Sequence, residues 1–290
     1  MSNEINRKTV LDFTSVDRNN LDQTYLYAVY AEADWNISLG DLLGKDLKVL
    51  DQNGVARGEL SVNLQTGRAA ESNVALADYS INLGYNARNT VTSLNSITIG
   101  RDANLDGVNS AAIGPFSYVT GNGSYAYGLE SEIYGDEGTA LGARSYIVGD
   151  NGVAVGNSSR VEADSGTAVG DGSLVTAEDG VALGDSSVYG YRSIAAGYKA
   201  STYAAESSAF GPRSAAYGED STSVGSRSNS YGDESTSVGY RSSSYGIGSI
   251  ALGMRSHSEG VESIAGGSRS HSEGVNSAAY GPRSHSFGDE

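Results

Sequence analysis

The sequence predicts an all-β solenoid built of 14-residue coils. Three observations predict it: a glycine ladder of fixed period, a second ladder offset by seven residues, and alternation of small and larger side chains between them. The chain of 290 residues contains 39 Gly, but only 3 Pro, 4 Phe and no Cys. Because glycine buries no side chain and costs backbone entropy, this excess needs a structural reason. Self-similarity at a fixed period is typical of repeat architectures.

The two ladders define the period. Every step of the first ladder is 14 residues except the 13-residue step from Gly184 to Gly197. The first ladder consists of Gly100, Gly114, Gly128, Gly142, Gly156, Gly170, Gly184, Gly197, Gly211, Gly225, Gly239, Gly253, Gly267 and Gly281. The second consists of Gly107, Gly121, Gly135, Gly149, Ala163, Ala177, Gly190, Ala204, Gly218, Gly232, Gly246, Gly260, Gly274 and Gly288. Together they place a one-residue deletion between Gly184 and Gly190.

The repeating unit is S-x-A-Φ-G-x-x-S-x-x-x-G-x-x, where Φ is aliphatic or aromatic. Period-two alternation in each half predicts a short strand, and each Gly predicts a turn that needs positive φ or close backbone approach. Coils stacked at about 4.8 Å would give a rod section of about 65 Å. We expect Ala, Ser, Val and Ile inside the coil. The column before the first Gly, as in Leu141 and Leu183, should then lie outside as an apolar ridge.

Residues 1–70 follow a different pattern and are predicted to be a small mixed attachment and capping domain, followed by the repeat rod over 71–290. Asn20–Trp35 is compatible with a helix that has a capping box, although Thr24–Tyr30 also alternates like a strand. Leu47–Leu50 and Val55–Leu64 flank Asn53-Gly54, which predicts a hairpin.

The rod is expected to become regular from about residue 96. Ser72–Ser80 matches the unit with Ala in place of Gly, and an insertion around Tyr85–Asn95 then separates this early repeat from the regular array.

Composition excludes several classes. The net charge is −16 without a basic stretch, so we expect no nucleic-acid binding. The sequence contains no run of about 18 apolar residues, so it predicts no membrane span. The N-terminus has no apolar segment typical of a secretory signal. Without Cys, disulfides and thiolate metal sites are excluded. No catalytic motif is present, so we expect no enzyme activity and no cofactor.

Stretches such as Ser110–Ser117 and Ser249–Ser256 make the repeat similar to the head repeats of trimeric autotransporter adhesins, the YadA-like heads. The resemblance covers about residues 71–290. It implies a left-handed parallel β-roll and a homotrimer, in which three apolar ridges would face one axis. The neck, coiled-coil stalk and membrane barrel of that family are not recognisable in the sequence.

We therefore favour a fibre protein of a phage or similar virion, such as a tail fibre, whisker or head fibre. Residues 1–70 would attach to other virion structural proteins, and the rod would adhere to a glycan or protein of the host surface. The alternative is the passenger head of a bacterial trimeric adhesin on the cell surface. An ice-binding rod is a third interpretation, supported only by Thr222 and Thr236.

Two columns could hold a cation. A histidine column could be a metal or pH-switch site, although an exposed outward column is the preferred interpretation. An acidic column could bind Ca²⁺, although a solvated turn is preferred. The metal-site candidates are Asp136, Asp150, Asp164, Glu178, His257, His271 and His285.

Two further columns could form a ligand-binding surface. A basic column either forms ion pairs between coils or chains, which we prefer, or binds anionic host glycans. A tyrosine column, which begins at Tyr189, either packs in the trimer, which we prefer, or offers a platform for sugars. The candidates are Lys199, Arg213, Arg227, Arg241, Arg255, Arg269, Arg283, Tyr203, Tyr217, Tyr231 and Tyr245.

Overall fold

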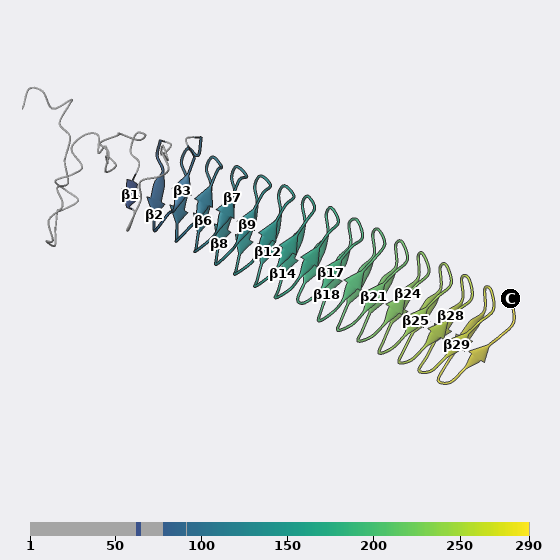
Figure 1. Ribbon diagram of the computed structural model, residues 1–290. Coiled ribbons are helices and arrows are strands. Elements are labelled where there is room, and N and C mark those ends of the chain that lie inside the picture. Colours follow the sequence, from purple (N-terminus) through teal and green to yellow (C-terminus); the bar gives the residue numbers. More distant parts are fainter. Residues whose placement is uncertain (1–61, 65–77, 91, 290) are drawn as a thin grey trace, which may run out of the picture.

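The computed structural model describes residues 62–64, 78–90 and 92–289. These residues form a straight rod of stacked coils (Figure 1), with two parallel β-sheets on opposite sides of each coil. The described residues contain 31 strands and no helix. The predicted parallel β-solenoid of 14-residue coils is confirmed. The helix or strand predicted at Asn20–Trp35, the strand Leu47–Leu50 and most of the early repeat at Ser72–Ser80 lie outside the described residues.

The first sheet has 16 strands, each of three residues. In sheet order they are β1 (Val62–Leu64), β2 (Ile81–Leu83), β4 (Ile97–Ile99), β6 (Ala111–Ile113), β8 (Tyr125–Tyr127), β10 (Thr139–Leu141), β12 (Val153–Val155), β14 (Thr167–Val169), β16 (Val181–Leu183), β18 (Ile194–Ala196), β20 (Ser208–Phe210), β22 (Thr222–Val224), β24 (Thr236–Val238), β26 (Ile250–Leu252), β28 (Ile264–Gly266) and β30 (Ala278–Tyr280).

The second sheet has 15 strands, each of two residues. In sheet order they are β3 (Arg88–Asn89), β5 (Asn104–Leu105), β7 (Tyr118–Val119), β9 (Glu132–Ile133), β11 (Tyr146–Ile147), β13 (Arg160–Val161), β15 (Leu174–Val175), β17 (Ser187–Val188), β19 (Ser201–Thr202), β21 (Ala215–Ala216), β23 (Asn229–Ser230), β25 (Ser243–Ser244), β27 (His257–Ser258), β29 (His271–Ser272) and β31 (His285–Ser286).

The repeat columns set the register. Ala140 pairs with Ala154, and Ile147 with Val161, so each residue lies beside its counterpart in the next coil. Three irregularities occur. Ile81 pairs with Ile97, which places two extra residues in the turn after β3. Leu174 pairs with Ser187, which places the deleted residue in the turn between β16 and β17. Finally, β1 joins the first sheet in parallel with β2 although it lies within the segment predicted as a hairpin and attachment domain.

Glycine is favoured at both turns for the reasons that the ladders predict, although Ala163, Ala177 and Ala204 replace it in three coils of the second ladder. Gly142 has φ of 141°, and a Cβ there would lie 2.3 Å from the carbonyl oxygen of Gly156. Gly135 needs no positive φ, but a Cβ would lie 2.2 Å from the carbonyl oxygen of Gly149. Backbone of one coil therefore touches backbone of the next at both edges of the rod.

The coil interior contains small side chains, as predicted. The Ala column, such as Ala140 and Ala154, is fully buried, and Leu141 in the column before Gly is 39% exposed. Ser145 is also fully buried, and its hydroxyl donates a hydrogen bond of 3.0 Å to the carbonyl oxygen of Gly142. In most coils, the serine three residues after the first-ladder glycine satisfies a turn carbonyl in this way.

Candidate functional site

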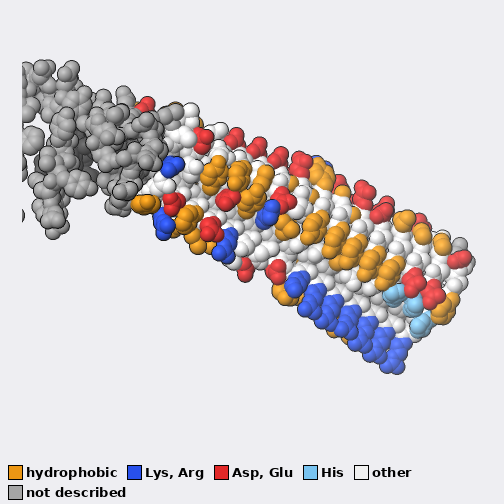
Figure 2. Space-filling view, viewed as in Figure 1, with side chains coloured by type: hydrophobic (Ala, Val, Ile, Leu, Met, Phe, Trp, Pro, Cys, Tyr) orange, Lys and Arg blue, Asp and Glu red, His pale blue; other side chains and the backbone are white. Residues whose placement is uncertain are grey.

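The basic column forms one unbroken row along an edge of the rod. It lies in the turns that lead into the second sheet, and six of its seven side chains are exposed, Arg227 being half-buried. Figure 2 shows the row as a continuous blue line toward the C-terminal end. All seven residues have φ between 55° and 61°. The left-handed region is unfavourable for side chains other than Gly and Asn, so backbone conformation does not explain why Arg is repeated there.

The row forms no ion pairs with the residues that the structure describes. Among the described residues, Lys199, Arg213, Arg227, Arg241, Arg255, Arg269 and Arg283 take part in no salt bridge. Two of the seven lie over the ring of the preceding tyrosine: Lys199 over Tyr198 at 5.2 Å and Arg241 over Tyr240 at 5.1 Å. The ion pairing between coils that the sequence favoured is therefore not formed among the described coils; pairing between chains stays a prediction.

Nearer the N-terminus, this face of the rod carries mixed charges that neutralise one another. Arg144 forms an ion pair of 3.0 Å with Glu130, its neighbour in the preceding coil. Arg160 pairs with Glu162, and its guanidinium lies 4.8 Å from the ring of Tyr146. A shallow hollow of about 370 Å³ lies here, and it is lined by Glu130, Glu132, Arg144, Tyr146, Ser158 and Arg160. The row of unpaired cations is thus confined to the C-terminal half of the rod.

The tyrosine column forms a stacked ladder on the outer face of the second sheet. Neighbouring rings of Tyr189, Tyr203, Tyr217, Tyr231 and Tyr245 have centroids 4.6–5.4 Å apart and planes 2–16° apart. Each inner ring therefore has a neighbour against both faces, and the ladder presents ring edges and phenol oxygens to solvent. Burial, together with neighbouring tyrosines, raises the pKa of Tyr217 and Tyr231, so these phenols remain donors at neutral pH.

Short side chains separate the ladder from the basic row. They are Ser201, Ala215, Asn229 and Ser243, each four residues after a first-ladder glycine, and they are buried or half-buried. The basic row, this short row and the tyrosine ladder run parallel from Lys199 to Tyr245. We call these three rows the basic–tyrosine strip.

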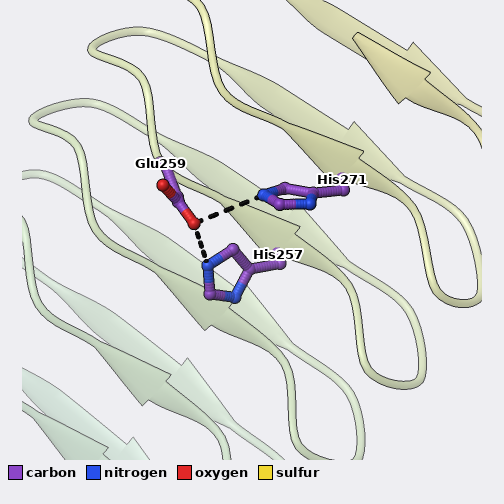
Figure 3. A group of neighbouring side chains, drawn as sticks. All are labelled: His257, Glu259 and His271. Carbon is purple, nitrogen blue, oxygen red and sulfur yellow. Dashed lines mark hydrogen bonds and ion pairs between the residues drawn. The ribbon is translucent and has the colours of Figure 1, made fainter. Parts of the chain in front are cut away.

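Beyond Tyr245 the column of short side chains changes to histidine, and the column of the tyrosine ladder changes to glutamate. Nε2 of His257 lies 2.6 Å from Oε1 of Glu259, and Nε2 of His271 lies 3.3 Å from the same oxygen (Figure 3). The two histidines are neighbours in register on β27 and β29, and Glu259 lies two residues after His257, on the same face. The hydrogen bond from His257 holds the pKa of Glu259 below its usual range.

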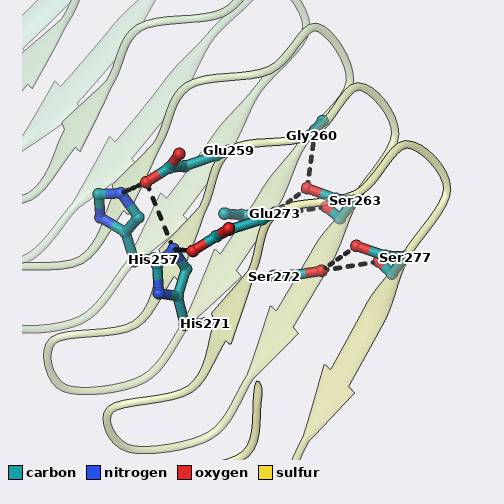
Figure 4. A network of polar contacts seen from close by, with 9 residues as sticks. His257, Glu259, Gly260, Ser263, His271, Ser272, Glu273 and Ser277 are labelled. Atoms are coloured by element: carbon teal, nitrogen blue, oxygen red, sulfur yellow. Dashed lines mark hydrogen bonds and ion pairs between the residues drawn. The ribbon is translucent and has the colours of Figure 1, made fainter. Parts of the chain in front are cut away.

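Glu273 extends this group. Its Oε1 lies 3.4 Å from Nε2 of His271, and the hydroxyls of Ser272 and Ser277 form a separate buried network behind the sheet (Figure 4). In the described part of the chain, His257, Glu259 and His271 are the group of three ligand-type side chains that could hold a metal, with their ligand atoms within 4.8 Å of one another. His285 is not a member, and its ring stacks on Phe287. Sequence reasoning missed Glu259 as a group member, although its i+2 spacing from His257 is the signal.

The acidic column performs a structural task in the chain. Backbone N–H of Asp136 donates to Oδ1 of Asp150, and N–H of Asp150 donates to Oδ1 of Asp164, both at 2.8 Å. Asn122 precedes them and donates to Oδ1 of Asp136 in the same way. Each carboxylate thus satisfies a turn amide of the preceding coil, and the backbone amide compensates part of its charge.

Comparison with known families supports the sequence resemblance. A family model described as "YadA head domain repeat (2 copies)" matches residues 106–131, 148–173, 162–187, 189–214, 204–228, 216–242 and 230–256. The chain contains YadA head repeats. No curated protein matches the chain. The YadA head repeats include the part of the rod that carries the basic–tyrosine strip, and such repeats in a β-solenoid are typical of structural adhesin proteins rather than enzymes.

Across the described residues, no helix is long and apolar enough to cross a membrane.

Proposed function

We propose that the chain is the rod of a homotrimeric, left-handed β-roll fibre that projects from a particle or cell and adheres to a host surface. The observation that carries this proposal is the outer face of the first sheet. In the three-residue strands from β2 onward the middle side chain is buried, so the other two lie on the outer face. These outward positions include Leu141, Leu183 and Leu252, which are 39–42% exposed.

A ribbon of apolar side chains along the whole rod is unusual for a monomer. Burying it against two further copies around one axis would stabilise the assembly at about 25 cal/mol per Å² of apolar area. YadA head repeats usually form trimers, which supports this arrangement. Each ribbon would then face the axis, and the second sheet, with the basic–tyrosine strip, would face outward.

Native mass spectrometry of the full chain tests the assembly. We expect a species of three times the 30.0 kDa chain mass. Because two Leu-to-Asp changes would bury unpaired charges at the axis, L141D/L183D should dissociate the trimer. A monomer of the unchanged chain would overturn the proposal. Binding of the fluorescently labelled trimer to host cells tests the adhesive role, with the dissociated variant as the comparison.

Two settings fit this function. In a virion, residues 1–70 would attach the fibre to other structural proteins of the particle and the rod would reach the host. On a bacterial surface, the rod would be the passenger head of a trimeric adhesin, and the YadA head repeats favour this second setting. Immunogold labelling of native particles and of whole cells distinguishes them, because the label should decorate particle appendages in one case and the cell surface in the other.

A further inference from the structure

The basic–tyrosine strip has two properties that the coil fold does not require. The turn position of its cations is left-handed in other coils as well, where it holds Asp102, Phe116 or Ser158, so the fold needs the backbone conformation but not a repeated cation. The cations repel one another at a spacing of one coil, about 4.8 Å, and they have no salt-bridge partner in the described chain. A bound polyanion would turn this repulsion into attraction.

The ladder indicates which kind of polyanion fits. Nucleic acids bind to aromatic side chains through stacking of bases on exposed ring faces. The faces of Tyr203, Tyr217 and Tyr231 are covered by neighbouring rings, so a base would have to separate the ladder. What the ladder offers instead is a line of phenol hydroxyls, and these match a ligand rich in hydroxyl groups.

The strip is elongated and bounded. The short row between the cations and the ladder leaves room for a chain that lies along the rod and contacts both rows. At the C-terminal end the ladder is replaced by Glu259 and Glu273, which repel an anion. At the N-terminal end the turn before Lys199 carries Asp185 in place of a cation. A linear ligand is therefore favoured over a branched or globular one.

We propose that the basic–tyrosine strip binds a linear acidic polysaccharide, whose carboxylate or sulfate groups pair with Lys199, Arg213, Arg227 and Arg241 and whose hydroxyls bond to the tyrosine ladder. The inference rests on the proposed adhesive function, because it names the ligand class of that fibre. Bidentate pairing of Arg with carboxylate or sulfate supplies the directional contacts.

Fluorescence anisotropy with a labelled heparin decasaccharide tests the proposal on the full chain. Replacing three cations in R213Q/R227Q/R241Q should weaken binding about tenfold or more at moderate salt. The matched control R101Q/R144Q/R160Q removes the same charge from the N-terminal half and should change binding less than about twofold. Y217F/Y231F keeps the stacked rings but removes two hydroxyls and should weaken binding about threefold or more.

Three results would overturn the proposal: equal losses in the two arginine triples, binding of a labelled oligothymidine tighter than that of heparin, or an unchanged affinity of the tyrosine variant. Native mass spectrometry on the same samples separates this failure from failure of the proposed function. If the chain is a trimer that binds host cells but both triple arginine variants lose the same heparin affinity, the fibre proposal stands and the strip is not its binding site.

A second inference rests on the histidine cluster alone. Ligands of a tetrahedral Zn²⁺ at about 2.0–2.2 Å from the metal lie about 3.3–3.6 Å from one another. Nε2 of His271 lies 3.3 Å from Oε1 of Glu259 and 3.4 Å from Oε1 of Glu273. Nε2 of His257 lies 2.6 Å from Oε1 of Glu259, and the ligand atoms of His257, Glu259 and His271 all lie within 4.8 Å of one another, so side-chain shifts of about 1 Å would bring the three to tetrahedral spacing.

We infer that His257, Glu259 and His271, with Glu273 beside them, bind one Zn²⁺ per chain. Isothermal titration of the full chain without a polyhistidine tag should show one Zn²⁺ site. H257A, H271A and E259Q should each weaken binding at least about tenfold, whereas H285A and E262Q, which lie outside the cluster, should not. Absence of a zinc site, or equal effects of H285A and H271A, would overturn the inference.

Discussion

The N-terminal and C-terminal halves of the rod share one backbone but have different interiors. The inward position of the second sheet is Leu105, Val119, Ile133, Ile147, Val161, Val175 and Val188 in the first half. In the second half it is Thr202, Ala216, Ser230, Ser244, Ser258, Ser272 and Ser286. The contiguous apolar cluster accordingly runs from Leu105 to Ala200 and stops there. The 13-residue step lies just before the change.

Each half of the rod compensates for the size of the inward side chain of the second sheet by a change at another position of the same coil. Four coils of the first half have Gly138, Gly152, Gly166 or Gly180 where most others have Ser. A Cβ on Gly152 would lie 2.7 Å from Cγ2 of Ile147, so the glycine makes room for the larger residue. In the second half Ser263 fills that position and bonds to Ser258 at 2.6 Å. The comparison teaches that coil geometry fixes the volume of the interior, whereas the side chains that fill this volume can be apolar or polar.

Truncating the apolar interior should have the largest effect. We expect Ile147→Ala to lower the free energy of local opening by about 2–5 kcal/mol, because it removes buried carbon and leaves a cavity. Ser244→Ala, at the matching position of the second half, should cost less than about 1.5 kcal/mol, since it removes one hydroxyl contact. Native-state hydrogen exchange of the flanking strands measures both. Equal losses would show that the halves are energetically alike.

Filling the glycine position should come next. Gly152→Ser places a side chain against Ile147 and should cost about 1–3 kcal/mol through overpacking. Combining it with Ile147→Ala should relieve the clash, so the double variant should be more stable than the sum of the single changes predicts. A double-mutant cycle by thermal unfolding measures the coupling, and strict additivity would contradict the volume compensation.

Two serines of the polar interior should respond differently. Ser263 donates to the carbonyl oxygen of Gly260 at 2.7 Å and also contacts Ser258, so Ser263→Ala should cost about 1 kcal/mol. Ser235 occupies the same column, but within the described chain its buried hydroxyl has no hydrogen-bond partner. Ser235→Ala should therefore be neutral or slightly stabilising. A loss at Ser235 matching that at Ser263 would mean that burial, not hydrogen bonding, governs this column.

Alkaline pH should give the smallest effect. Burial and a hydrogen bond to Glu132 raise the pKa of Tyr134 to about 12. Because the folded pKa exceeds the unfolded value of about 10, the neutral phenol contributes stability below pH 10 that is lost as pH rises toward 12. Ultraviolet difference titration should show late ionisation, and Tyr134→Phe should reduce the loss of stability in that window. Ordinary ionisation of Tyr134 near pH 10 would contradict this.

The coil itself could be predicted because Gly142 and Gly135 mark both edges at fixed spacing, and alternation assigns Ala140 inward and Leu141 outward. The two ladders likewise place the one-residue deletion between Gly184 and Gly190, and the strand register narrows it to the turn after Leu183. The joining of His257 and His271 through Glu259 was not predicted, since it depends on side-chain rotamers across two coils. Nor was the use of Asp150 to accept a backbone N–H, because sequence spacing alone does not distinguish that bond from a solvated turn.

The direction of the bonds between coils has a mechanical consequence. Gly142 N–H donates to the carbonyl oxygen of Tyr127 in the preceding coil at 2.9 Å, and every coil repeats this pattern along the rod. A pulling force on the two ends of one chain would load these bonds one coil at a time. Each yielding coil would release 14 residues, or about 45 Å of slack. The half with the serine interior should extend first, so a fibre under shear would lengthen in small steps before its apolar half gave way.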